Sequence, residues 1–197
     1  SVLLLEKGKD LSERNRRIAK DITTGWGGAG AFSDGKLNLS TEVGGWLTEY
    51  VSPPELEDLI GYADDVYREF GGDAPVYGVD EQTVADIRKR AAEAGLKLIP
   101  TRIRHLGTEI CVKVLKAMRD FLDREVEIRT GMAVEEILIK DGRVVGVVTG
   151  DGEETRSDYV VVAPGREGAD WLAAEGRRLN LQLVNNAVDI GMRVETP

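Results

Sequence analysis

The sequence is poor in the two residue types that most often build metal centres and cross-links. Cys111 is its one cysteine and His105 its one histidine. A single thiol excludes a disulfide within the chain and a cysteine-rich metal site, and it favours a reducing, cytoplasmic setting. A single imidazole excludes multi-histidine metal sites and leaves one candidate base for a serine-histidine triad. We therefore expect no metal site.

Basic residues are also in deficit, and long apolar runs are missing. The chain has 26 Lys and Arg against 35 Asp and Glu, a formal charge of −9, which opposes binding to phosphate backbones and anionic membranes. No apolar run approaches the roughly 20 residues of a membrane-spanning helix. Neither nucleic acid nor membrane is an expected partner. The small basic cluster of Arg14, Arg16 and Arg17 is interpreted as a solvated face with no function.

What is present indicates a soluble globular fold. The 197 residues, 42% of them apolar, suffice for one domain of ordinary size. Residues 2–5 form an apolar run typical of a parallel strand buried on both faces, and no basic segment precedes them as in a secretory signal. Because the chain begins directly with this strand and its last residues show no terminal turn, we expect both ends of the chain to be truncated.

The most unusual stretch is the glycine-rich segment Gly25–Lys36. So many glycines exclude ordinary helix or strand and let the backbone approach another group closely. Trp26, Phe32 and Leu37 favour a packed loop over a flexible linker. Ligand contact is therefore the favoured interpretation, with Ser33, Asp34 and Lys36 offering polar groups at its edge.

Helical periodicity is clearest in three places. Pro53–Pro54 and the acidic residues after them predict a helix start, with Ser52 available as the cap, and the helix ends near Phe70. A second helix is predicted from Asp80 to Ala94, and Leu96 to Ile99 is then expected to form a short strand. The third, Thr108–Asp123, has one apolar face that should bury Cys111 as a structural thiol.

Strand patterns dominate the remainder. Val126–Thr130, Ala133–Lys140, Val144–Thr149 and Thr155–Arg156 predict a strand and a hairpin-linked meander. Tyr159–Ala163 is expected to be a further apolar strand, followed by a small-residue turn and a helix from about Gly168 to Glu175. The tail Val188–Glu195 alternates like a strand.

One acidic residue at a strand end suggests chemistry. Glu6 closes the first strand, where a dinucleotide-binding fold presents a carboxylate to a ribose hydroxyl. Many strands end in glutamate, so this signal is weak alone. The glycine-rich fingerprint should lie about 20 residues earlier, which is before residue 1.

Several segments together resemble a known family. Residues 3–8, 27–37, 103–109, 162–166 and 188–191 are similar to the uncharacterised FAD-dependent dehydrogenases, flavoproteins with a fumarate-reductase-like or glutathione-reductase-like FAD-binding domain. The resemblance spans essentially the whole chain, and residues 27–36 are its most specific part. Family members carry a cysteine-containing stretch ahead of that segment. Residues between Arg17 and Ile22 lack it, so this loop is expected to be flexible if residues have been lost there.

The resemblance implies FAD as the cofactor and a set of positions that hold it. The implied cofactor-binding residues are Glu6, Lys7, Gly8, Gly27, Gly28, Ala29, Gly30, Ser33, Asp34, Gly35, Lys36, Val134, Ala163, Pro164, Gly165 and Arg166. Glycine amides and a lysine near a flavin supply donors and stabilise its reduced anion. His105 is the one candidate catalytic residue, although a lone histidine at a helix entry is more often structural.

These observations predict an α/β fold: an FAD/NAD(P)-binding Rossmann-like domain over residues 1–197, with a mainly parallel sheet. An antiparallel β-meander at about 126–157 and a helical insertion at about 53–94 complete it. The first strand, its glycine-rich turn and a substrate domain beyond residue 197 are expected to be absent, leaving this fragment inactive. The predicted function is hydride or two-electron transfer between FAD and an unknown substrate, with NAD(P)H a further candidate partner. A non-redox nucleotide- or partner-binding module and a flavin-dependent RNA-modifying enzyme are the alternatives.

Overall fold

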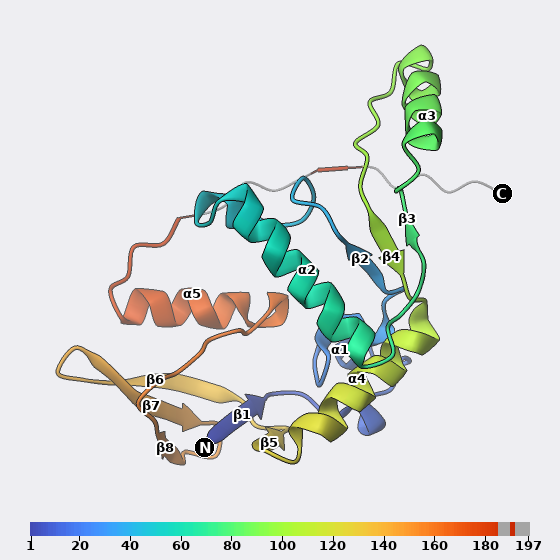
Figure 1. Ribbon diagram of the computed structural model, residues 1–197. Helices are drawn as coiled ribbons and strands as arrows, with labels where there is room; N and C mark the ends of the chain where they lie inside the picture. Colours follow the sequence, from blue (N-terminus) through green and yellow to red (C-terminus); the bar gives the residue numbers. More distant parts are fainter. Residues whose placement is uncertain (185–189, 192–197) are drawn as a thin grey trace. The chain divides into compact units, whose positions relative to one another are not determined.

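The computed structural model describes residues 1–184 and 190–191, and the chain divides into two compact units, Ser1–Ala133 and Val134–Pro197. The fold is mixed α/β and contains both parallel and antiparallel strand pairs (Figure 1). The predicted tail strand, 188–195, lies almost wholly outside the described residues.

The first unit contains nine helices and strands and three short 3-10 turns among its described residues. Its helices are α1 (Ala19–Thr23), α2 (Pro53–Glu69), α3 (Glu81–Glu93) and α4 (Thr108–Leu122). Its strands are β1 (Val2–Glu6), β2 (Lys36–Asn38), β3 (Val76–Tyr77), β4 (Ile103–His105) and β5 (Val126–Thr130). The 3-10 turns are η1 (Leu11–Glu13), η2 (Gly28–Phe32) and η3 (Leu47–Glu49).

Strands β1 and β5 pair in parallel, in register from Val2 opposite Val126 to Glu6 opposite Thr130. Past the ladder, the backbone amide of Gly131 donates to the carbonyl of Gly8 at 2.6 Å, and that of Met132 donates to the carbonyl of Glu6 at 2.9 Å. These bonds tie the carboxyl ends of the two strands together. The predicted strands at both positions are confirmed, but β1 is not buried on both faces as expected: Val2 is exposed and the other four residues are half-buried.

A second sheet has the order β2-β4-β3, and both of its pairings are antiparallel. The strand predicted at Leu96–Ile99 is wrong: these residues have no regular structure, and Leu96 and Ile99 are exposed. A strand needs a partner for its backbone groups. The partners β2 and β3 flank residues 103–105 instead, which the sequence pattern did not reveal.

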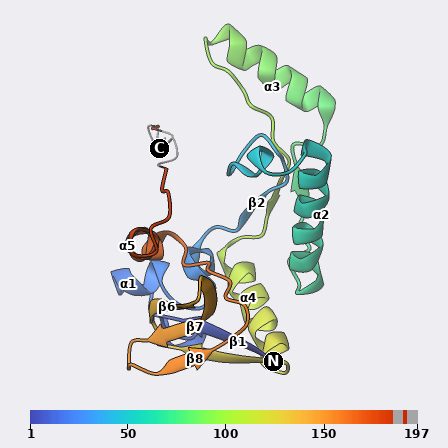
Figure 2. The same cartoon turned by 90° about the vertical axis from the view of Figure 1, so that its left-hand side faces the viewer.

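The predicted helices are confirmed, with one correction at a cap. The Ser52 side chain makes no capping bond to α2. Pro53 and Pro54 have no amide hydrogen to donate, so few orphan donors remain for a cap to satisfy. Helix α3 does have its cap, because the Asp80 carboxylate accepts from the Thr83 amide at 2.7 Å. In both views, α3 lies at the end of the β3–β4 ladder away from α4 (Figures 1 and 2).

The core of the first unit lies between α4 and the glycine-rich segment. Cys111 and Val114 of α4 are buried, as is Ala31 of η2. The Trp26 indole donates to the carbonyl of Leu115 at 3.0 Å, which fixes the segment on the helix. Both the packed loop and the buried Cys111 thiol are confirmed, and burial raises the pKa of that thiol.

The second unit is a meander followed by a helix. It comprises β6 (Val134–Lys140), β7 (Arg143–Thr149), β8 (Glu154–Arg156), η4 (Arg166–Gly168) and α5 (Ala169–Arg178). The strands pair antiparallel in the order β6-β7-β8, so a meander and a helix form as predicted. The expected start of the meander at about residue 126 is wrong, because β5 pairs in parallel with β1 instead. The strand predicted at Tyr159–Ala163 is wrong, because these residues form no ladder and Val161 is 93% exposed. In the described residues only β1 and β5 pair in parallel. The predicted mainly parallel sheet is therefore wrong.

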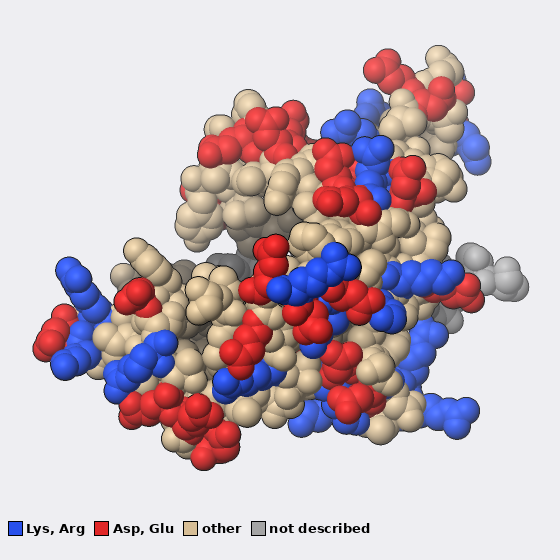
Figure 3. Space-filling view, turned by 60° about the horizontal axis from the view of Figure 1, so that its bottom comes forward, with Lys and Arg blue, Asp and Glu red and all other residues tan. Residues whose placement is uncertain are grey.

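The surface mixes charges of both signs. On the face drawn in Figure 3, acidic and basic side chains are interspersed without a broad field of one sign. Within residues 1–184 and 190–191, no helix is both long enough and apolar enough to cross a membrane.

Candidate functional site

The turn after β1 brings two of the sequence-predicted segments together. The Gly8 amide donates to Oε1 of Glu6 at 2.7 Å, so the carboxylate is held at the end of the strand. A Cβ placed on Gly8 would lie 2.4 Å from the Gly25 nitrogen, and the Trp26 amide donates to the carbonyl of Lys9 at 2.9 Å. The turn at Glu6 therefore packs directly on the beginning of the glycine-rich segment.

The glycines of that segment fall into two groups. Gly35 has a φ of +69°, and a Cβ there would lie 2.2 Å from the Cys111 sulfur, so its glycine is explained by packing. Gly28 and Gly30 differ, because nothing lies within 4 Å of a Cβ built on either. Open space therefore lies on the Cα side of both residues, while the Gly28 amide donates to the Gly25 carbonyl at 2.8 Å. At Gly35 the close backbone approach predicted for the segment is thus made to Cys111 within the protein. At Gly28 and Gly30 space is left for a ligand.

Arg14 organises this segment, and its role was missed by the sequence analysis. Its side chain is 8% exposed, and its guanidinium donates to the carbonyls of Asp21, Ile22, Trp26 and Gly28 at 2.5–3.0 Å. The guanidinium carbon also lies 4.8 Å from the centre of the Phe32 ring. Desolvation lowers its pKa, which the charges of Glu6 and Asp21 partly offset. The expectation of a solvated basic cluster is wrong at this position.

A buried arginine can be recognised only by its partners, and carbonyl groups leave no signature in a sequence. Arg16 and Arg17 are exposed, as expected. The segment between Arg17 and Ile22, where the resemblance suggested a loop, contains the start of α1. Asp21 in this helix is buried and accepts from Lys9 Nζ at 2.9 Å.

The polar end of the segment lies against β4. The Ser33 hydroxyl accepts from the Gly35 amide at 2.9 Å, and Lys36 forms an ion pair of 2.8 Å with Asp34. The hydrogen bond from Lys36 is the main cause that holds the pKa of Asp34 below its usual value. His105 pairs with Lys36 across the β2–β4 ladder and is exposed. The structure therefore brings His105 next to Lys36, at the end of the predicted cofactor loop.

The remaining predicted residues belong to the second unit. Val134 opens β6 opposite Thr149. Gly165 has a φ of +62° and precedes η4, and Ala163 is exposed beside it. Within the second unit, the backbone groups of residues 163–166 are therefore accessible, directly before η4.

The residues of the first unit suit the ribose and phosphate portions of a dinucleotide. Such a ligand needs an acceptor for ribose hydroxyls and unobstructed amides for phosphate or flavin oxygens. Glu6 supplies the acceptor, since the Gly8 amide engages one of its two oxygens. A Cβ built on Gly28 or Gly30 meets open space, although the Gly28 amide already donates to the Gly25 carbonyl at 2.8 Å and the Gly28 carbonyl accepts from Arg14 at 2.7 Å. Lys36, 53% exposed, adds a positive charge at the far end of the same segment.

Comparisons with known proteins give distant similarities. No family model matches the sequence. A curated relative from Clostridium beijerinckii, described as an uncharacterized protein, is 26% identical over 207 residues, covering 99% of this chain and 32% of its own length. This chain therefore spans about a third of the length of that relative.

Two solved structures are similar at the level of a partial fold. The L-amino acid deaminase from Proteus vulgaris with its specific insertion sequence deleted has a TM-score of 0.48 and 17% identity, over 92% of this chain and 50% of that one. The L-amino acid deaminase from Proteus myxofaciens in complex with anthranilate has a TM-score of 0.45 and 18% identity, over 84% and 40%. Similarities of this size leave the activity to be deduced from the site itself.

Proposed function

We propose that this chain is the FAD-binding part of an FAD-dependent oxidoreductase that transfers a hydride or two electrons between FAD and a small-molecule substrate. The observation that carries the proposal is the turn after β1, where Glu6 ends a parallel strand and packs through Gly8 against the glycine-rich segment. A carboxylate at the carboxyl end of a parallel strand is how dinucleotide-binding folds hold a ribose.

Each residue then has a definite task. One oxygen of Glu6 remains to accept ribose hydroxyls while the other accepts from Gly8. The open space beside Gly28 and Gly30 takes phosphate or flavin oxygens, and Arg14 holds the backbone there in place through its carbonyl bonds. When bound, FAD supplies the electron chemistry, so the protein contributes binding, orientation and charge.

Further positions complete the proposal. Lys36 forms an ion pair with Asp34. In this proposal its ammonium group lies close to the flavin and stabilises the negative charge of the reduced form. His105, exposed beside it, is the proposed donor to a flavin or substrate oxygen. In the second unit, the backbone at Val134 is assigned to the adenine and residues 163–166 to the flavin side. NAD(P)H is the proposed electron partner.

The visible absorbance spectrum of the full-length protein as purified tests this proposal, with this chain plus added FAD measured beside it. Visible flavin absorption bands are expected for the full-length protein. A full-length protein that stays colourless in excess FAD contradicts the proposal and favours a non-redox nucleotide- or partner-binding module on the same fold.

A further inference from the structure

Helix α3, in the excursion between β3 and β4, has an apolar side that the first unit leaves uncovered. The row consists of Val84, Ile87 and Ala91, with Ala94 at the C-cap, at intervals of three, four and three residues. This spacing places them along one side of the helix, as in helices that pair with another helix. No residue of α3 is buried, and Ile87 is 44% exposed. The row is therefore available to a partner.

A short helix of this kind needs such a partner. Helix α3 has 13 residues, and isolated helices shorter than about 12–15 residues are marginal in water. Most helical stability in proteins comes instead from packing of an apolar side. The Asp80 cap fixes the start of α3, but the segment that returns to β4 leaves Leu96 67% and Ile99 55% exposed. Apolar surface along this excursion is thus left for a second molecule to cover.

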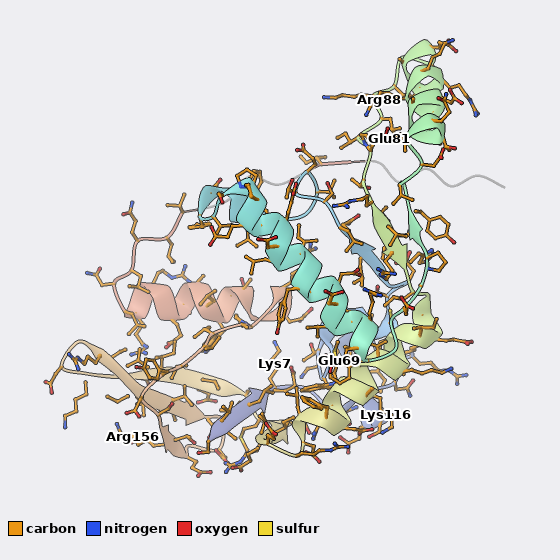
Figure 4. All side chains as sticks on the ribbon, in the orientation of Figure 1. Lys7, Glu69, Glu81, Arg88, Lys116 and Arg156 are labelled. Atoms are coloured by element: carbon orange, nitrogen blue, oxygen red, sulfur yellow. The ribbon has the colours of Figure 1, made fainter. Side chains whose placement is uncertain are left out.

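Charged residues flank the apolar row in a regular order. Glu81 and Arg88 are seven residues apart and so lie on the same flank of the row, about two turns from each other. Figure 4 labels both residues on α3. In the described part of the chain, neither of them forms an ion pair. The other flank carries Thr83 and Arg90. One flank therefore presents an acidic and a basic group that can both pair with another molecule.

We propose that α3 pairs antiparallel with α3 of a second copy of this protein. A two-fold axis brings the same flank of both helices together and reverses the order of its residues. Glu81 of each copy then faces Arg88 of the other, and Arg90 faces the uncharged Thr83. A parallel pair would bring Arg88 opposite Thr83 and leave Glu81 without a cation. The charge pattern therefore selects the antiparallel pair.

The proposed interface is small, so the dimer should be weak. At 1.5 Å per residue, α3 is about 20 Å long, which limits the contact to the weak, transient class of interfaces. We expect a dissociation constant on the order of 10 µM. The pairing uses none of the residues assigned to FAD, so it stands whether or not the protein binds flavin.

Sedimentation velocity of the full-length protein tests the proposal, at about 1–100 µM protein and about 50 mM salt, because higher salt screens exposed ion pairs. We expect a monomer–dimer equilibrium. Glu81→Arg and Arg88→Glu each turn two attractive contacts into repulsive ones and should each weaken dimerisation about tenfold. The matched control is Lys89→Glu, which makes the same charge change on the side of α3 away from the row and should alter the dissociation constant less than about twofold.

An equimolar mixture of Glu81→Arg and Arg88→Glu is the sharper measurement. In a mixed dimer every changed residue again faces an opposite charge, so the mixture should dimerise within about threefold of the unaltered protein while each variant alone stays weak. A mixture that associates no better than the separate variants overturns the proposal, even if the unaltered protein dimerises through another surface.

Ile87→Ser tests the apolar row independently of charge. Isoleucine and serine have similar helix propensities, and Ile87 is exposed enough for the variant to keep its circular dichroism spectrum. Dimerisation should weaken at least about tenfold, because one apolar contact is lost on each side of the two-fold axis. An unaltered protein that remains monomeric at the highest concentration overturns the proposal. If that monomer sediments with phosphatidylserine vesicles, the row is a membrane-binding surface instead.

Discussion

Arg14 fixes the glycine-rich segment through its guanidinium, which donates to four backbone carbonyls. Carbonyls in a loop with many glycines have few partners of their own, and burial without partners is costly. A planar cation with five donors can satisfy four carbonyls at once, whereas a lysine ammonium has only three donors. The conformation of residues 25–32 therefore depends on a residue outside that segment.

Arg14→Lys should lower the free energy of unfolding by about 2–4 kcal/mol, because at least two buried carbonyls lose their donor. Urea unfolding followed by circular dichroism measures the change. Arg17→Lys is the matched control, since Arg17 is exposed, and it should change the free energy by less than about 0.5 kcal/mol. Equal effects in the two variants would show that the guanidinium does not hold the segment.

Two glycines of the same segment should respond differently to alanine. At Gly35 a Cβ would lie 2.2 Å from the Cys111 sulfur and would require a φ of +69°. We expect Gly35→Ala to destabilise the protein by about 2–4 kcal/mol from overpacking and backbone strain. Gly30→Ala meets open space and should be neutral or stabilising by up to about 1 kcal/mol. Melting curves of the two variants decide this, and a stable Gly35→Ala protein would refute the packing described.

At the scale of elements, helix α5 covers the outer edge of β6. Oε2 of Glu175 accepts from the Ile137 amide at 2.9 Å, and Arg178 donates to the Ile137 carbonyl at 2.6 Å. Arg178 also donates to both carboxylate oxygens of Glu175 at 2.7–2.8 Å. The two side chains thus replace the neighbouring strand that an edge strand lacks.

Glu175→Ala should lower the free energy of unfolding by about 2–3 kcal/mol, because the buried Ile137 amide loses its acceptor. Arg177→Ala, at an exposed position of the same helix, is the control and should have little effect. Hydrogen exchange at Ile137 measures the change locally. An unchanged exchange rate at Ile137 in Glu175→Ala would contradict the proposed edge cover.

The same carboxylate predicts a pH dependence. Hydrogen bonds from Arg178 are the main cause that holds the pKa of Glu175 below its usual value, which is about 4.3 in an unfolded chain. A depressed pKa contributes stability that is fully present above that value and is lost as the pH falls through the folded-state pKa. Acid titration of Glu175→Gln should therefore show a smaller loss of stability below about pH 4 than the unaltered protein.

Elements with strong periodicity could be predicted, and elements that depend on partners could not. The apolar face around Val114 identified α4, and two apolar runs joined by a hairpin turn identified β6 and β7. Residues 159–163 have the composition of a buried strand, yet no neighbouring strand supplies their hydrogen bonds. Short strands such as β2 and β3 have too few residues to show alternation and exist because β4 lies between them. At the site, Glu6 and the glycine-rich segment were recognisable from residue types, whereas Arg14 required its carbonyl partners.

At the scale of the whole molecule, the excess of acidic residues limits the ligands that the protein can take. On the face drawn in Figure 3, charges of both signs are interspersed, and three lysines, Lys7, Lys9 and Lys20, line the pocket beside the turn after β1. A nucleic-acid strand needs a positive track along many phosphates.

We therefore expect no RNA binding by the full-length protein at about 150 mM salt, where a site of one or two phosphate contacts gives negligible affinity. Filter binding with a labelled transfer RNA across a salt series measures this. Tight binding with a steep salt dependence would contradict the prediction and support a flavin-dependent RNA-modifying enzyme instead.

If Glu6 holds the ribose of FAD, the affinity of Glu6→Gln for FAD is the most direct test of that contact. Glutamine keeps the oxygen that accepts from the Gly8 amide but replaces the second acceptor with a donor, so the turn is preserved and the ribose contact is lost. Flavin fluorescence titration of the full-length protein should show binding weakened about 10- to 100-fold, the loss of one or two charge-assisted bonds. The exposed Glu13→Gln control should bind FAD as the unaltered protein does. Equal FAD affinity in both variants, or no FAD binding in the unaltered protein, would contradict the account.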